Sequence, residues 1–250
     1  MASSRVPLAA LIFDVDGTLA DTERDGHRIA FNQAFQSAGL DWHWSVALYG
    51  ALLAVTGGKE RIRHYLAQFH PERLNDPACD ALIGSLHQRK TRAYAALAAS
   101  GGLPLRPGVA RLIDEARRAG LRLAIATTTT PENVTVLLEH SLQPGSAAWF
   151  EVIGAGDVVA AKKPAADIYH WVLARLKLPA AACLAVEDSD NGLRAARGAG
   201  LTTIVTTNDY TLGQDFRAAA AVLPNLDDNG RGTPVTLADL QRWHEAGQAG

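Results

Sequence analysis

The segment Leu11-Ile12-Phe13-Asp14-Val15-Asp16-Gly17-Thr18 places two carboxylates, two residues apart, directly after an apolar run. An unbroken apolar run of this kind is typical of a strand that is buried on both faces. Gly17 allows the chain to turn immediately after the second carboxylate. The segment therefore predicts a buried strand that ends in an acidic site.

Further apolar runs of strand length follow, and helix-length segments separate the later ones. With the first run, they cover residues 8–13, 121–126, 152–153, 183–186 and 202–205. Because the runs are unbroken and strand alternates with helix, we expect an α/β fold, a Rossmann-like parallel sheet with helices on both faces. Proline, glycine and asparagine predict helices after Pro107-Gly108, from Pro164 and after Asp190-Asn191-Gly192, and a last helix over residues 234–246.

Residues 21–95 interrupt this alternation. Apolar residues recur there at helical spacing, for example around Phe31 and Tyr65, without a convincing strand pattern. We therefore expect a small helical cap over residues 21–95, inserted after the first strand and lying above the acidic site. The catalytic core is then discontinuous and comprises residues 1–20 and 96–250.

Composition excludes several classes of partner. The 250 residues are 48% hydrophobic and 20% charged, with 24 basic and 26 acidic side chains, so neither a nucleic-acid footprint nor a polybasic membrane anchor is indicated. Cys79 and Cys183 lack paired metal-ligand spacing, which suits a reducing compartment. The first apolar run is too short to span a bilayer. We expect a cytoplasmic monomer that binds neither nucleic acid nor membrane.

Polar residues follow three of the predicted strands. Asp14, Thr127 and the pair Glu187-Asp188 each come directly after an apolar run. Ligands of open α/β sheets bind at the carboxyl ends of the strands, so these side chains should converge. Asp14 is the candidate nucleophile, because a carboxylate can accept a phosphoryl group and release it to water.

The other acidic and basic residues predict the remaining parts of such a site. Mg²⁺ prefers one or two carboxylates together with retained waters, so we expect Asp14 and Asp188 to bind it with a backbone carbonyl near Asp16, and Glu187 to lie behind them. Asp16 is the candidate general acid and base, provided that its neighbours keep it partly protonated. Lys163 and Thr127 would bind the transferring phosphoryl oxygens.

Each motif also has a purely structural interpretation. The two aspartates can form a capping turn, and Glu187-Asp188-Ser189, Asp190 or Asn191 can cap the helix that follows them. Lys162 competes with Lys163, and Thr127 to Thr130 can simply end a strand. The order of the four motifs along the chain favours the catalytic interpretation.

These residues together resemble the four motifs of the haloacid dehalogenase superfamily, over nearly the whole chain. The motifs are Asp14-Val-Asp16-Gly-Thr18, Thr127, Lys163-Pro164 and Glu187-Asp188. The inserted segment is similar to the helical cap of the β-phosphoglucomutase-like subgroup. The resemblance implies an Mg²⁺-dependent phosphatase or phosphomutase, and the presence of Asp16 disfavours dehalogenation.

The cap resembles that of the family's phosphatases acting on xylulose-1,5-bisphosphate, an inhibitor of Rubisco. The similarity is carried by residues 14–23, Tyr49 and residues 56–62. Two glycines that open a helix expose backbone amides, and cations in its first turn favour a second phosphate there. The small phosphorylated sugar is expected to contact Glu23, Tyr49, Gly57, Gly58, Lys59, Glu60, Arg61, Arg63, Lys90, Thr128 and Thr129.

Alternatives remain open at this stage. Glu23 can instead offset a helix dipole, Gly57-Gly58 can be a plain turn, and Lys59 with Arg63 can form an exposed helix face. A β-type phosphoglucomutase would return the phosphoryl group to the sugar, and a receiver-type signalling module would keep it on aspartate. Trp42, Trp44, Tyr94 and most of the histidines are interpreted as packing or surface residues, and no histidine is assigned a catalytic role.

Overall fold

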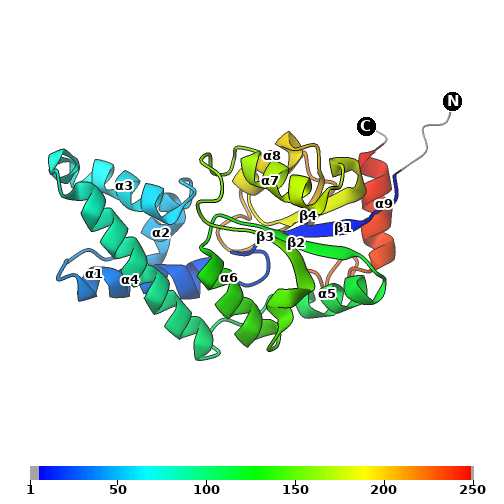
Figure 1. The fold of residues 1–250 in the computed structure, drawn as a ribbon, viewed down its shortest axis with the longest axis horizontal. Helices are drawn as coiled ribbons and strands as arrows, with labels where there is room; N and C mark the ends of the chain where they lie inside the picture. Colours follow the sequence, from blue (N-terminus) through cyan, green and yellow to red (C-terminus); the bar gives the residue numbers. More distant parts are fainter. Residues whose placement is uncertain (1–5, 249–250) are drawn as a thin grey trace.

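The computed structural model describes residues 6–248, which form a six-stranded parallel sheet with helices on both faces and a helical cap (Figure 1). The sheet order is β3-β2-β1-β4-β5-β6. The strands are β1 (Ala10–Phe13), β2 (Arg122–Ala126), β3 (Phe150–Gly154), β4 (Cys183–Glu187), β5 (Thr202–Thr206) and β6 (Ala221–Leu223). The predicted fold class is confirmed.

The helices and short helical turns occupy the intervals between the strands. They are η1 (Glu23–His27), α1 (Arg28–Ser37), α2 (Val46–Leu52), α3 (Gly58–Phe69), η2 (Pro71–Asn75), α4 (Cys79–Ala99), α5 (Val109–Arg118), α6 (Pro131–Leu137), η3 (Leu138–Leu142), η4 (Ser146–Trp149), α7 (Asp167–Leu176), η5 (Ala180–Ala182), α8 (Asp190–Gly198) and α9 (Leu237–Gly247). Helix α5 begins where the sequence predicts. Helix α8 begins at Asp190, and thus includes the Asp190-Asn191-Gly192 segment that was expected to precede it. Helix α7 begins at Asp167 rather than at Pro164.

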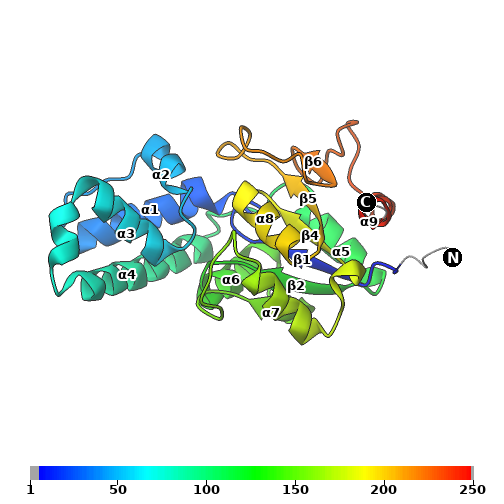
Figure 2. The same ribbon diagram turned by 90° about the horizontal axis from the view of Figure 1, so that it is seen from above.

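Sequence analysis missed β6. This strand has only three residues and forms the edge of the sheet beside β5, as Figure 2 shows. Its central residue, Val222, is 48% exposed, so the segment lacks the long apolar run that marks the inner strands.

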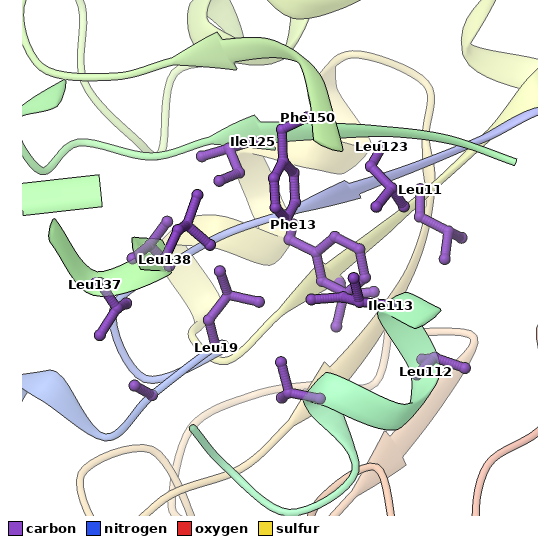
Figure 3. Close-up of a cluster of buried hydrophobic side chains, with 14 of the residues drawn as sticks. Leu11, Phe13, Leu19, Leu112, Ile113, Leu123, Ile125, Leu137, Leu138 and Phe150 are labelled. Carbon is purple, nitrogen blue, oxygen red and sulfur yellow. The ribbon is translucent and has the colours of Figure 1, made fainter. Parts of the chain in front are cut away.

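The two faces of β1 carry two separate cores. Leu11 and Phe13 pack on one side, in a cluster that includes residues of α5 and α6 (Figure 3). Ala10 and Ile12 point to the other side, into a cluster with α7 and α8. All four residues are fully buried, and burying a large apolar side chain contributes about 1.5–3 kcal/mol. The apolar run is therefore unbroken because helices pack on both faces of the strand.

The cap lies at one end of the sheet (Figures 1 and 2). It has its own aromatic core, in which Trp44 lies between Phe31 and Tyr65 with ring-centroid distances of 4.6 and 5.4 Å. Helix α4 continues past the predicted cap boundary to Ala99, and its residues Tyr94 and Ala98 join the core cluster around β1. The division at residues 20/21 and 95/96 stays a prediction.

Strand register brings the predicted motifs to one edge of the sheet. Phe13, the last residue of β1, pairs with Ile125 on one side and with Val186 on the other. By this register, Asp14 lies level with Ala126 and Glu187, and Thr127 and Asp188 come one residue later. Acidic and hydroxyl side chains from distant parts of the sequence therefore meet at this edge.

No helix within residues 6–248 has the length and hydrophobicity needed to cross a membrane. Cys79 and Cys183 are both buried and carry free thiols.

Gly108 precedes α5 and Gly120 follows it, and the two have similar backbone conformations. Comparing them separates the cost of close packing from the cost of backbone strain. Gly108 has φ 83° and Gly120 has φ 77°, and a side chain in this left-handed region costs about 1–2 kcal/mol. A Cβ at Gly108 would also lie 2.4 Å from the backbone of Leu226, whereas one at Gly120 would meet nothing within 4 Å. We expect Gly120→Ala to lower the free energy of unfolding by about 1 kcal/mol and Gly108→Ala by more than about 3 kcal/mol. Urea unfolding measures both, and equal losses would contradict the packing argument.

Candidate active site

A cleft of about 370 Å³ lies between the carboxyl ends of the strands and the cap. Both the core and the cap line it. The predicted residues among its walls are Asp14, Asp16, Glu23, Arg61, Thr127, Thr128, Lys163 and Asp188.

Lys163 links two carboxylates at the base of this cleft. Its Nζ donates to Asp14 Oδ1 and to Glu187 Oε1, each at 2.6 Å. The hydroxyl of Tyr169 also donates to Glu187 Oε1. Lys163, rather than Lys162, therefore contacts the candidate nucleophile. Lys162 instead pairs with Asp157 at 2.8 Å.

Local geometry leaves Glu187 and Asp188 free of a capping role. The hydroxyl of Ser189 accepts the N–H of Gly192 and caps α8. A Cβ at Gly192 would lie 1.9 Å from Glu187 Oε2, so glycine at this position leaves space for the carboxylate. Asp188 Oδ2 accepts a hydrogen bond of 2.8 Å from the side-chain amide of Asn208.

The acidic residues fit a divalent cation. Asp14, Glu187 and Asp188 each offer a carboxylate oxygen, and these oxygens lie within 4.8 Å of one another. Burial, together with the charges of Glu187 and Asp16, raises the pKa of Asp14 to about 8 despite Lys163, and burial beside Asp14 and Glu187 raises the pKa of Asp188. Three ionised carboxylates and one lysine would leave two excess negative charges, which Mg²⁺ would balance.

Asp16 has a different environment from the one that we expected. Its Oδ1 accepts from the Thr22 hydroxyl and lies 2.6 Å from His27 Nε2. Burial raises the pKa of Asp16, but the charge and hydrogen bond of His27 and the Thr22 hydrogen bond outweigh it and lower the pKa to about 2. The expectation that neighbours keep this carboxyl partly protonated was therefore wrong.

His27 is the main side chain that sequence reasoning missed. It is 3% exposed, and its ring stacks on Tyr94 with a centroid distance of 4.2 Å. It lies eleven residues after Asp16 in a π-helical turn, so no motif spacing links the two. Tyr94, Trp42 and Trp44 are buried packing residues, as predicted.

Asn208 and Arg106 were also missed. Asn208 follows β5 just as the motif residues follow their strands, and this position was the available signal. The buried guanidinium of Arg106 donates to the carbonyls of Gly17, Thr207 and Pro224, among others. It thereby joins the loop after β1 to the loops after β5 and β6.

The cap contributes a connected group of three side chains. The Tyr49 hydroxyl donates to Glu23, and Arg61 Nη1 donates to that hydroxyl at 2.8 Å. Arg61 also lies 3.7 Å from Glu23 Oε2. Tyr49 and Arg61 are buried, so this group projects from the cap core toward the cleft.

The glycines at the start of α3 face the same region. Gly57 has φ 98°, and a Cβ there would lie 2.2 Å from Glu60 Oε2, so the Glu60 carboxylate folds over the helix start. Lys90 is buried and lies over the rings of Phe31 and Tyr94, at 5.3 and 5.4 Å. Burial lowers the pKa of Lys90 to about 8, although Asp16 and Glu23 favour its charge.

Lys59 and Arg63 lie farther from the cleft. Lys59 is half exposed and pairs with Asp157 at 2.7 Å, across the gap between cap and core. Arg63 pairs with Asp80 on the cap surface and lines none of the cavities described here. The structure thus does not bring Arg63 together with the other predicted residues.

The threonines after β2 are held in place by the loop itself. The Thr127 hydroxyl accepts from the backbone N–H of Thr129, and the Thr129 hydroxyl accepts from Asn133. Thr127 and Thr129 are buried, and Thr128 lines the cleft.

Comparison with known proteins identifies the family. The model of the haloacid dehalogenase-like hydrolase family matches residues 8–200. The chain belongs to this family. CbbY from Rhodobacter capsulatus is 53% identical over 219 residues, covering 88% of this chain and 94% of that protein. The plasmid-encoded CbbY of Cupriavidus necator is 50% identical over 247 residues, covering 95% of this chain and 97% of that protein.

A solved structure extends this similarity to the fold. A CbbY mutant from Rhodobacter sphaeroides, in complex with xylulose-1,5-bisphosphate, is 47% identical and has a TM-score of 0.81, covering 87% of this chain and 94% of its own. The resemblance inferred from the four motifs is confirmed, as is the prediction of a hydrolytic enzyme, a phosphatase.

Binding of Mg²⁺ should release protons at pH 7. With a pKa of about 8, Asp14 is mostly protonated at that pH in the metal-free protein, and a bound cation favours the ionised carboxylate. The pKa of Asp188 is also raised by burial beside Asp14 and Glu187, so its carboxyl should contribute to the release. We expect release of about one to two protons per Mg²⁺, and an affinity that falls at least about tenfold for each pH unit below 8.

Isothermal titration calorimetry in two buffers of different ionisation enthalpy measures this release. Asp14→Asn is the control, because it lacks one of the two titrating carboxyls and should release fewer protons. Binding without any proton release by the unaltered protein would contradict the assignment.

Proposed function

We propose that this protein is an Mg²⁺-dependent phosphatase that hydrolyses a sugar bisphosphate, xylulose-1,5-bisphosphate, through an aspartyl phosphate on Asp14. The observation that carries this proposal is the contact of Lys163 with both Asp14 and Glu187 beneath a cleft roofed by charged cap residues. The CbbY relatives support the substrate, since one of them is known in complex with this bisphosphate.

The chemistry follows from the positions of the side chains. An Asp14 oxygen attacks phosphorus, the bond to the sugar oxygen breaks, and that oxygen takes a proton from Asp16. Water then attacks the aspartyl phosphate, Asp16 takes a proton from it, and inorganic phosphate leaves. Lys163 and Thr127 offset the negative charge on the phosphoryl oxygens.

Asp16 must gain a proton before it can donate one. Its low pKa means that the free enzyme holds it ionised. His27, whose Nε2 lies 2.6 Å away, is positioned to supply that proton. His27 is thus assigned a role for which the sequence offered no signal.

Asp14 and Asp188 would hold Mg²⁺, and Glu187 would fix Lys163 behind them. When bound, the cation neutralises phosphate charge and orients the phosphoryl group for in-line attack. Glu187 is fully buried and already bonded to Lys163 and Tyr169, which favours this supporting position.

The cap would bind the second phosphate and the sugar hydroxyls. Backbone N–H groups at the start of α3 are the proposed donors, once the phosphate displaces the Glu60 carboxylate that folds over them. Arg61 and Lys90 bring buried positive charge to the same cavity. Glu23, fixed by Tyr49 and Arg61, is placed to accept hydrogen bonds from sugar hydroxyls.

One experiment tests substrate and reaction type together. Purified protein with Mg²⁺ is assayed against a panel of sugar monophosphates and bisphosphates, ranked by kcat/KM, with free phosphate and isomerised product both followed. We expect phosphate release, with a bisphosphate ranked first. Isomerised sugar without phosphate release would identify a phosphomutase instead.

Asp14→Asn should abolish turnover while the fold remains. The amide cannot form the phosphoryl ester, but it can still fill the space beside Lys163. We expect kcat to fall by more than about 1,000-fold, with unchanged thermal unfolding. Rapid-quench labelling should find the phosphoryl ester on Asp14 in the unaltered protein, and an ester at another residue would sink the assignment.

Lys59→Ala should weaken bisphosphates more than monophosphates. If Lys59 exchanges Asp157 for the second phosphate, KM for the bisphosphate should rise about tenfold and KM for a small monophosphate should change less than about twofold. Arg63→Ala is the matched variant on the same helix. Its exposed pairing with Asp80 predicts no change, and an equal effect of both variants would show that general surface charge is responsible.

A further inference from the structure

His87 packs directly on the start of α3. It belongs to α4, and a Cβ at Gly58 would lie 2.7 Å from its Cδ2 and 2.8 Å from its Nε2. Any residue larger than glycine at position 58 would therefore displace the ring. This imidazole has no hydrogen-bond partner among residues 6–248, so both ring nitrogens are available to a ligand.

The ring also lines two cavities between cap and core. The inner cavity reaches Asp16, Glu23 and Lys90, and the outer one, of about 130 Å³, reaches Lys59 and Asp157. The walls common to both are Gly57, Gly58, His87, Thr128 and Thr130. Of these five residues, only His87 has a ring nitrogen that can donate or accept a hydrogen bond.

Charged groups from several elements face His87. Burial, Lys90 on its own helix, Lys59 on α3 and His27 in η1 lower its pKa to about 4, while Asp157 after β3 acts in the opposite direction. The ring is thus neutral at pH 7 and offers one N–H donor and one acceptor nitrogen. Lys59 and Lys90 both act on the ring, but Lys59 is paired with Asp157 at 2.7 Å. An anionic group that enters this region therefore meets the ring donor and Lys90, and it gains Lys59 only by displacing Asp157.

We propose that His87 binds the substrate at the end remote from Asp14, through hydrogen bonding between its imidazole and the second phosphate or an adjacent hydroxyl at the Gly57-Gly58 turn. This inference rests on the proposed function, and it adds a specificity residue to the cap. It also explains why position 58 is occupied by glycine, since a side chain there would fill the space that the His87 ring occupies.

The test compares His87→Gln and His87→Ala with the unaltered protein on two substrates, xylulose-1,5-bisphosphate and p-nitrophenyl phosphate. We expect His87→Ala to raise KM for the bisphosphate about tenfold and His87→Gln, which keeps a donor and an acceptor, to raise it less. The kcat/KM for p-nitrophenyl phosphate, which has no second phosphate, should change less than about twofold.

Gln88→Ala is the matched control, because Gln88 is the exposed neighbour on the same helix, and it should change neither substrate. Bisphosphate KM values within about twofold of the unaltered protein for both His87 variants would overturn the inference. Equal losses on both substrates would also overturn it, since they would indicate a structural role. Failure of the unaltered protein to hydrolyse the bisphosphate would instead remove the proposed function, and this inference with it.

Discussion

The ammonium group of Lys163 is the contact on which the active-site region depends. Three carboxylates that lie within 4.8 Å of one another repel each other strongly in a buried site. Lys163 offsets part of that repulsion by bonding to Asp14 and Glu187 together. Because Asp14 directly follows β1 and Glu187 is the last residue of β4, the same contact fixes the two central strands relative to each other.

The division of labour between core and cap follows from this arrangement. The core supplies the acidic cluster and its lysine at the ends of the parallel strands, where register alone brings them together. The cap supplies the positive charge of Arg61 and Lys90 on the opposite wall. Under the proposed function, a substrate with two phosphates would contact both walls, so the cap residues would bear on specificity and the core residues on reaction type.

Much of the core could be predicted from sequence because its signals are local. The apolar run before Asp14 predicts a strand that is buried on both faces. The polar residues at the ends of the inner strands predict the position of the site. His27 could not be found in this way, because its bond to Asp16 depends on how η1 enters the cap. The three-residue strand β6 also lacked a signal, whereas Asn208 followed the same rule as Thr127 and was overlooked. The environment of Asp16 was misjudged because its charge state depends on these same tertiary contacts.

Helix α4 has 21 residues, and a helix of that length spans about 30 Å. Its first turns lie in the cap core, and its last turns, with Tyr94 and Ala98, pack among residues of the sheet cluster. Tyr94 in turn stacks on His27, the partner of Asp16. Because one helix joins both packing regions, any tilt of α4 relative to the sheet would displace the Tyr94 ring that stacks on His27. The position of the cap and the surroundings of Asp16 therefore depend on the same element.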